Sequence, residues 1–256
     1  MFRPRVIPCL LLQNLGLVKT VKFKKPRYVG DPMNAVRIFN KKQADELIFL
    51  DINATKEKRI PSLELIQKIG EECFMPFAVG GGIRTIEDIR RILRAGAEKV
   101  VINSYAVTNP GFIKEASRVF GAQSIVVSVD VKKPLWGQYE VYTHGGSKST
   151  GIGPVEFVKQ VESYGAGEIF LNSIDRDGTM EGYDINLIRN VSDSVSVPVI
   201  ACGGAGSLDD IRRALVDGNA FAASAGSFFV FHGRRRAVLI NYPTREELIK
   251  YCSINY

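Results

Sequence analysis

Two glycine-rich segments of the chain could hold phosphate groups. They are Val79–Ile83, which reads VGGGI, and Ala201–Gly206, which reads ACGGAG. Glycine lets backbone N–H groups approach an anion closely, and the start of a following helix adds a favourable dipole. Each segment precedes a strand that ends in small polar residues, Asn103–Ser104 in one case and Gly226–Ser227 in the other. A single glycine run could be only a tight turn, but two matching copies predict two phosphate sites.

One carboxylate stands where it could transfer protons. Asp130 ends the apolar run Ile125–Lys132, IVVSVDVK, whereas the corresponding run Cys9–Gly16, CLLLQNLG, carries Leu11. A carboxyl group can act as a general acid or base, and leucine can do neither. A second polar segment, Ser173–Thr179, reads SIDRDGT; its Asp-Gly pair could form a simple turn, but its polar groups also fit a functional loop.

An internal repeat relates the two halves of the chain. The segment Met75–Leu93, MPFAVGGGIRTIEDIRRIL, aligns with Val197–Leu215, VPVIACGGAGSLDDIRRAL, at a spacing of 122 residues, Asp88 to Asp210. The same spacing relates Glu46 to Glu168 and several other positions along the chain. A repeat that keeps one register over half the chain indicates duplication of a structural unit.

Each half contains strands, glycine-rich turns and amphipathic helices in alternation. The expected strands are Arg5–Leu12, Glu46–Ile52, Phe77–Val79, Lys99–Asn103, Ser124–Val131, Glu168–Ser173, Val197–Cys202 and Ala220–Ala225. Near-continuous apolar runs are typical of parallel strands that are covered on both faces. Eight such units in 256 residues predict an α/β protein with a (β/α)8 TIM barrel built from two half-barrels. A doubly wound sheet is the alternative, but it would not explain the repeat.

We expect one barrel domain spanning residues 1–256. It has an insertion near residues 132–146, expected to be a β-hairpin, and a short C-terminal extension whose segment from Thr244 begins as a helix. At the other end of the expected barrel, four charged residues begin four strands: Arg5, Glu46, Lys99 and Glu168. Their signs alternate, so they predict a ring of ion pairs, which by itself could be a structural plug.

Composition excludes several classes of protein. No apolar run reaches the ~20 residues of a membrane span, and the N-terminal segment lacks the features of a secretory signal. The four cysteines and two histidines have no metal-ligand spacing, so we expect no metal, no cofactor and a cytoplasmic location. The net charge is +7, with basic runs at Lys19–Arg27 and His232–Arg236. Without a nucleic-acid motif, these runs fit solvated loops or contacts to small phosphorylated ligands better than a nucleic-acid surface.

The motifs DELIFLDI, VGGGI, KVVIN, SIDRDGT followed by GYD, and ACGGAG resemble the HisF family, the cyclase subunits of imidazole glycerol phosphate synthase. The resemblance covers about residues 1–230 and implies a barrel that receives ammonia from a glutaminase subunit docked on its N-terminal face. It implies that Arg5, Glu46, Lys99 and Glu168 form the ammonia gate. It also implies that a bis-phosphorylated ligand is bound by Gly81, Gly82, Asn103, Ser104, Asp177, Gly178, Gly203, Gly204, Gly226 and Ser227.

The resemblance further implies catalysis by two aspartates, at the ends of the first and fifth barrel strands. Asp130 matches the second aspartate, and Lys19 and Asp51 match other residues of the catalytic mouth, but Leu11 replaces the first aspartate. This departure, and the segments around residues 9–32 and 229–243, resemble HisF-like paralogues associated with acetamidino modification of bacterial surface sugars. That branch implies a third component, an ATP-dependent amidotransferase that forms the amidine.

Three hypotheses follow from the sequence. The first is a HisF-like barrel that conducts ammonia for amidine formation on a nucleotide-linked sugar in O-antigen or related polysaccharide synthesis. The second is the ordinary cyclase of histidine biosynthesis, although losing one member of an acid–base pair typically costs ~10²–10⁴ in rate. The third is a non-catalytic scaffold for the glutaminase and the amidotransferase.

Overall fold

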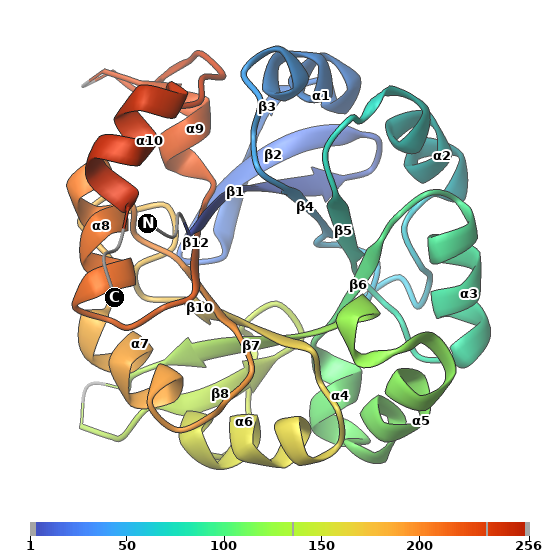
Figure 1. The fold of residues 1–256 in the computed structure, drawn as a ribbon. Helices are drawn as coiled ribbons and strands as arrows, with labels where there is room; N and C mark the ends of the chain where they lie inside the picture. The colour runs from blue at the N-terminus through green and yellow to red at the C-terminus, as the bar shows by residue number, and fades with distance from the viewer. Residues whose placement is uncertain (1–3, 135, 234, 254–256) are drawn as a thin grey trace.

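Eight parallel strands close into a barrel, which confirms the expected fold (Figure 1). The computed structural model describes residues 4–134, 136–233 and 235–253. The barrel strands are β1 (Arg5–Gln13), β4 (Leu47–Asp51), β5 (Phe77–Gly80), β6 (Lys99–Ile102), β7 (Ile125–Lys132), β10 (Glu168–Ser173), β11 (Val199–Cys202) and β12 (Ala222–Ala225). Pairing of β7 with β10 and of β12 with β1 closes the sheet on itself. Within this circle β1 and β7 lie on opposite sides.

Alternate residues of each strand face the barrel interior and the surrounding helices, because side chains of a strand point to opposite faces in turn. The interior cluster includes Ile7, Ile48, Val126, Phe170 and Ile200, all almost fully buried. The outward-facing residues of the same strands pack against the helices in a second, larger cluster. Both faces of the sheet are thus covered, which is why the strand sequences are apolar throughout.

Helices follow the strands and form the outer ring. Their bounds are α1 (Pro32–Lys41), α2 (Leu63–Glu72), α3 (Ile86–Arg94), α4 (Ser104–Thr108), α5 (Gly111–Phe120), α6 (Pro154–Ser163), α7 (Ile185–Ser192), α8 (Leu208–Val216) and α9 (Ser227–Val230). The repeat is visible in their caps: the Thr85 hydroxyl accepts from the Asp88 backbone N–H, and the Ser207 hydroxyl accepts from that of Asp210. Among the described residues no helix combines the length and apolarity needed to cross a membrane.

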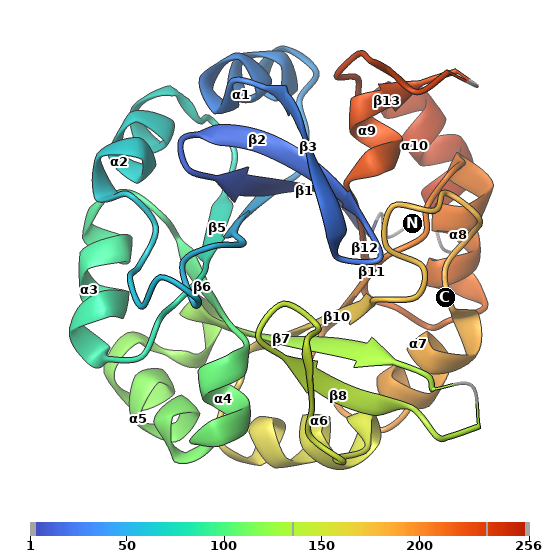
Figure 2. The ribbon, with the colours of Figure 1, turned by 180° about the vertical axis from the view of Figure 1, so that it is seen from behind.

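Two antiparallel extensions lie at the carboxyl ends of the strands (Figure 2). Strands β2 (Gly16–Val21) and β3 (Lys24–Gly30) form a hairpin that continues from β1. The basic run Lys19–Arg27 therefore lies in this hairpin and is not an irregular loop as the sequence suggested. After β7, antiparallel pairing with β8 (Glu140–Thr143) and then β9 (Lys148–Ser149) forms the second extension, in the region of the expected insertion.

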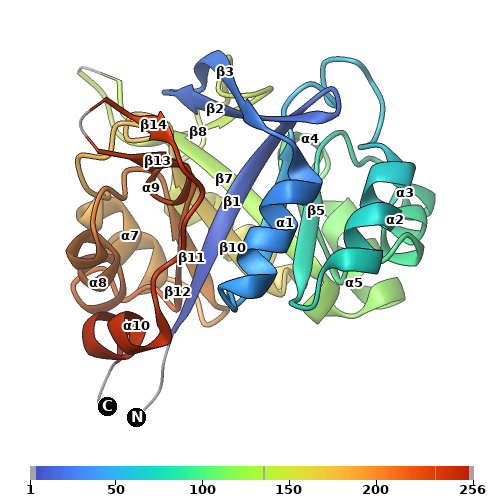
Figure 3. The same ribbon diagram turned by 90° about the horizontal axis from the view of Figure 1, so that it is seen from above.

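The C-terminal extension runs along the outside of the barrel from one end to the other (Figure 3). It begins at the end where β2 and β3 lie, with the short hairpin of β13 (Phe231–His232) and β14 (Ala237–Val238), and ends in α10 (Arg245–Cys252) near the N-terminus. Tyr242 anchors it: the buried ring packs near Phe39 and Phe229, and its hydroxyl donates to the Val6 carbonyl at 2.7 Å.

The strand register supports the expected equivalence of Leu11 and Asp130. Leu11 is paired with Leu50 of β4, and Asp130 is paired with Asn172 of β10. Leu50 and Asn172 are themselves separated by the 122 residues of the repeat. The two positions therefore occupy the same place in the two half-barrels, one on each side of the open end.

Candidate functional site at the carboxyl ends of the barrel strands

Asp130 is the buried carboxylate of the barrel mouth. It points to the interior face of β7, is 7% exposed, and accepts a hydrogen bond from the Ser128 hydroxyl at 3.4 Å. Burial raises the pKa of Asp130 to about 7, and the nearby Asp177 carboxylate acts in the same direction. A carboxyl group with a pKa near neutrality can both donate and accept a proton, which suits general acid–base chemistry.

The opposite wall of the mouth is apolar. Leu11 on β1 and its neighbour Leu50 on β4 both belong to the interior cluster of the barrel. The position equivalent to Asp130 in the first half-barrel is therefore occupied by leucine, which cannot transfer a proton.

Lys19 extends from β2 into the mouth. Its side chain is buried, and Nζ donates to the Cys9 carbonyl at 2.5 Å. The same ammonium lies against Gly226, where an added Cβ would be 2.0 Å from Nζ. The hairpin thus brings a cation to the loop after β12, where the sequence predicts a phosphate site.

Asp177 ties the β2–β3 hairpin to the loop after β10. Its carboxylate accepts from the Thr20 hydroxyl at 2.8 Å and from the Phe23 backbone N–H at 3.1 Å, and its carbonyl accepts from the Lys22 backbone N–H at 2.9 Å. Burial raises the pKa of Asp177, against the opposing effect of these hydrogen bonds. The side chain predicted to contact phosphate is therefore engaged in holding the hairpin across the mouth, while the adjacent Gly178 packs against the Thr20 carbonyl.

Asp51 shapes a loop at the mouth. Its carboxylate pairs with Arg59 at 2.6 Å and accepts from the backbone N–H groups of Asn53 and Ala54 at 3.0 and 3.1 Å. These contacts fix the turn between β4 and α2. Its predicted part in catalysis stays a prediction, and the structure gives it a positioning role.

The two glycine loops occupy equivalent places after β5 and β11. Gly82 has φ +66°, and an added Cβ would lie 1.8 Å from the Arg59 carbonyl oxygen; at Gly204, with φ +116°, it would lie 2.2 Å from that of Gly182. Only glycine fits such backbone positions. The neighbouring Gly81 and Gly203 also have positive φ values. The loops therefore bring bare backbone to the mouth on both sides, as a phosphate site needs.

The short helices α4 and α9 begin beside these loops, at Ser104 and Ser227. The Ser104 hydroxyl donates to the Asn103 side-chain oxygen at 3.0 Å and accepts from the His144 backbone N–H at the same distance. The Asn103 amide nitrogen donates to the Ser128 carbonyl at 3.0 Å. The first candidate phosphate site is thereby linked to the strand that carries Asp130 and to the β8–β9 extension.

Three further residues line the interior of the mouth, and motif reading did not find them. Asn172 is 6% exposed, and its Oδ1 is buried without a hydrogen-bond partner in the described structure. The thiols of Cys9 and Cys202 lie together, and the hydrogen bond that Cys202 donates to Cys9, together with burial, raises the pKa of Cys202. The alternation of inward-facing positions could have located all three. Across the described ranges, no three His, Cys, Asp or Glu side chains form a metal-ligating group.

The four charged residues at the other end of the barrel form one closed network. Arg5 pairs with Glu46 and, at 2.7 Å, with Glu168, while Lys99 pairs with Glu46 at 3.0 Å and with Glu168 at 3.1 Å. Burial alone would lower the pKa of Arg5, but the carboxylates of Glu168 and Glu46 have the larger combined effect, so the pKa of Arg5 is raised. We call these four residues the charged ring. The structure thus brings together all four residues predicted for a gate.

A closed (β/α)8 barrel with duplicated glycine loops at its mouth and a ring of ion pairs at its floor defines a TIM barrel built from two repeated halves. Residues 5–235 match the model of the histidine biosynthesis protein family. A Pseudomonas aeruginosa protein named "Putative imidazole glycerol phosphate synthase subunit hisF2" is 51% identical over 97% of this chain and 99% of its own length. A similarly named Leptospira interrogans protein is 50% identical over 96% of the chain and 98% of its own.

An Alkaliphilus metalliredigens protein named imidazole glycerol phosphate synthase subunit HisF is 47% identical over 91% of this chain and 92% of its own length. The chain belongs to the HisF family, the barrel subunits of a glutamine-dependent complex in which a glutaminase is the partner.

Proposed function

We propose that this barrel receives ammonia from a glutaminase docked on the charged-ring face and delivers it to a phosphorylated acceptor at the mouth. The acceptor is a nucleotide-linked sugar, and the product is an amidine used in bacterial O-antigen or related surface polysaccharide synthesis. An ATP-dependent amidotransferase partner activates the acceptor. The observation that carries this proposal is Leu11 facing Asp130 in a barrel whose charged ring and glycine loops are both intact.

The barrel interior supports transfer of a small neutral molecule. Above the charged ring, the interior is lined by apolar residues that include Ile7, Ala78, Val101 and Ala222. Neutral ammonia enters such surroundings far more readily than ammonium, because burying an unpaired charge is costly. Near the mouth the lining becomes polar at Asn172 and Asp130, which supplies acceptors for ammonia as it emerges.

The face around the charged ring has features of a docking surface. Phe74, just before β5, is 89% exposed, and Phe221, just before β12, is 41% exposed. The Arg5 guanidinium lies 5.9 Å from the centre of the Phe221 ring. Exposed aromatic side chains next to arginine are the residue types that dominate binding energy in protein interfaces.

Glutaminase stimulation tests the proposal. Glutamine hydrolysis by the purified glutaminase partner is expected to rise when the barrel is added, and Phe74→Ala is expected to weaken that effect. Lys114→Ala, on the outer helix α5, is the matched control and should leave it unchanged. No stimulation, together with no complex in gel filtration, would contradict the proposal.

The alternative is the cyclase reaction of histidine biosynthesis, supported by the retained Asp130 and by the Alkaliphilus relative named a HisF subunit. In that reaction ammonia and a phosphoribulosyl nucleotide give imidazole glycerol phosphate. Complementation of a histidine auxotroph that lacks the cyclase separates the two candidates. Growth would favour the cyclase, and its absence, with glutaminase stimulation intact, would favour amidine formation.

A further inference from the structure

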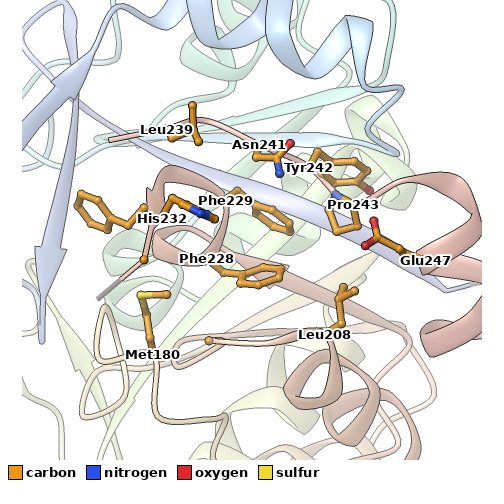
Figure 4. Close-up of a pocket in the computed structure, with 13 residues that line it drawn as sticks. Met180, Leu208, Phe228, Phe229, His232, Leu239, Asn241, Tyr242, Pro243 and Glu247 are labelled. Atoms are coloured by element: carbon orange, nitrogen blue, oxygen red, sulfur yellow. The ribbon is translucent and has the colours of Figure 1, made fainter. Parts of the chain in front are cut away.

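A cavity lies outside the barrel, beneath the C-terminal extension (Figure 4). Its volume is ≈ 260 Å³, and its walls come from α9, from β13 and the segment after β14, and from the loop between β10 and α7. Phe228, Phe229, Phe231 and Tyr242 supply aromatic surface, and Met180 closes one side. The volume is slightly below the ~300–1,000 Å³ usual for small-molecule pockets, so it suits a ligand part of one or two rings.

Three polar side chains border this aromatic cavity. His232 and Asn241 are exposed, and neither side chain has a hydrogen bond to another described residue. The Glu247 Oε2 atom accepts from Thr244 in the cap of α10, which leaves Oε1 available. A few hydrogen-bonding groups around an apolar cavity are the usual means of orienting a heteroaromatic ring.

Basic side chains stand next to the same cavity. The Arg27 guanidinium, from β3, lies 6.0 Å from the centre of the Phe231 ring, and Arg235 is exposed on the connection between β13 and β14. In the described structure neither arginine forms an ion pair. Arg236 donates to the carbonyls of Gly178 and Thr179 at 3.1 and 2.9 Å, which holds this hairpin in place. Arginine is well suited to phosphate because its planar group can bind two oxygens.

We propose that this cavity binds a nucleoside diphosphate. The base packs against Phe228 and Phe231, its polar edge meets His232 or Asn241, and the phosphates reach Arg27. The aromatic wall of this cavity lies outside the residues predicted to bind phosphate at the mouth, although Gly206 of the second glycine loop borders the cavity. The nucleotide site rests on the proposed function only in identifying the nucleotide as part of the acceptor, and the binding itself needs neither ammonia nor a glutaminase.

Calorimetric titration of the isolated barrel tests the site with ADP, GDP and UDP, and with inorganic pyrophosphate for comparison. At least one nucleoside diphosphate is expected to bind about tenfold more tightly than pyrophosphate. Phe231→Ala should remove that difference in affinity. Arg27→Ala should weaken the binding of both nucleoside diphosphates and pyrophosphate, and it should reduce the salt dependence of both. Because Phe231 is partly buried, its replacement could also disturb folding, so the exposed His232 and Asn241 are replaced as well. His232→Ala and Asn241→Ala are expected to weaken binding of the nucleotide and to leave binding of pyrophosphate unchanged.

Trp136→Ala and Lys114→Ala are the matched controls, an exposed aromatic and an exposed cation outside the cavity, and should bind like the unaltered barrel. Equal affinity for pyrophosphate and nucleotides would overturn the proposal, because only phosphate would then be recognised. Nucleotide binding unchanged in Phe231→Ala, His232→Ala and Asn241→Ala would also overturn it, by placing the ligand elsewhere. So would the absence of binding up to about 1 mM. None of these results would affect glutaminase stimulation.

Discussion

The two half-barrels agree in the parts that build the barrel and differ in the part that could do chemistry. Thr85 and Ser207 cap equivalent helices, and Glu46 and Glu168 make equivalent pairs in the charged ring. At the mouth, however, the second half presents Asp130 and Asn172 where the first presents Leu11 and Leu50. The two halves therefore agree in the contacts that build the barrel and differ in the polarity of the side chains at its mouth.

Introducing a carboxylate at position 11 is the strongest way to break this difference. Leu11→Asp is expected to raise the ammonia-dependent cyclase rate by about 10²–10⁴, because it recreates a second acid–base group opposite Asp130. Leu11→Asn is the matched control, with the same size and no proton to transfer, and should not raise the rate. The rate of both variants is measured as turnover of the phosphoribulosyl nucleotide with ammonium salts as the source of ammonia. An equal gain in both variants would contradict the acid–base explanation.

The charged ring allows a comparison between equivalent carboxylates. Glu46→Gln is expected to lower the free energy of unfolding by about 3 kcal/mol, because it leaves buried cations short of a partner. Glu168→Gln should cost less, since the Glu168 side chain is 12% exposed and that of Glu46 is 3% exposed. Urea denaturation measures both. A larger loss for Glu168 would show that burial does not set the order.

Asp130 should make the stability of the barrel depend on pH. Its pKa is raised from 3.8 to about 7, so the native protein retains this proton to a higher pH than the unfolded chain. Stability from this group is therefore present below pH 3.8 and is lost as the pH rises towards 7. Asp130→Asn should be more stable than the unaltered protein at pH 8, by up to ~4 kcal/mol at ~1.4 kcal/mol for each pKa unit, and similar to it at pH 4. Thermal melts at the two pH values measure this, and a pH-independent difference would count against the raised pKa.

The helix caps are expected to give the smallest and most symmetric effect. Thr85→Ala and Ser207→Ala should each cost about 1 kcal/mol, since each hydroxyl accepts from one backbone N–H at the start of its helix. Denaturant midpoints of the two variants should shift together. A much larger loss at one cap would show that the half-barrels do not tolerate the same local change equally.

The barrel could be predicted because each apolar run is a local signal of a strand, and the repeat relates the two halves of the chain at one constant spacing. Every expected barrel strand overlaps an observed one, and the charged ring follows from strand starts that converge at one end. The four residues of the charged ring could be placed together because closure of the barrel brings the starts of their strands to one end.

The β2–β3 hairpin could not be predicted in the same way. Its lysine-rich sequence is typical of a loop, and the contacts that hold it come from Asp177, more than a hundred residues away. Asp51 and Asp177 were predicted as site residues from motifs, but a motif does not show which partner a carboxylate meets. Arg59 and Thr20 are those partners, and only the folded chain brings them close.

Tyr242 lies in the wall of the outer cavity and also donates its hydroxyl proton to the carbonyl of Val6, the residue next to Arg5. One rigid ring thus touches both a surface near the open end and the first residues of the strand that starts at the floor. The C-terminal extension therefore connects the wall of the outer cavity to the backbone beside the charged ring through one buried side chain.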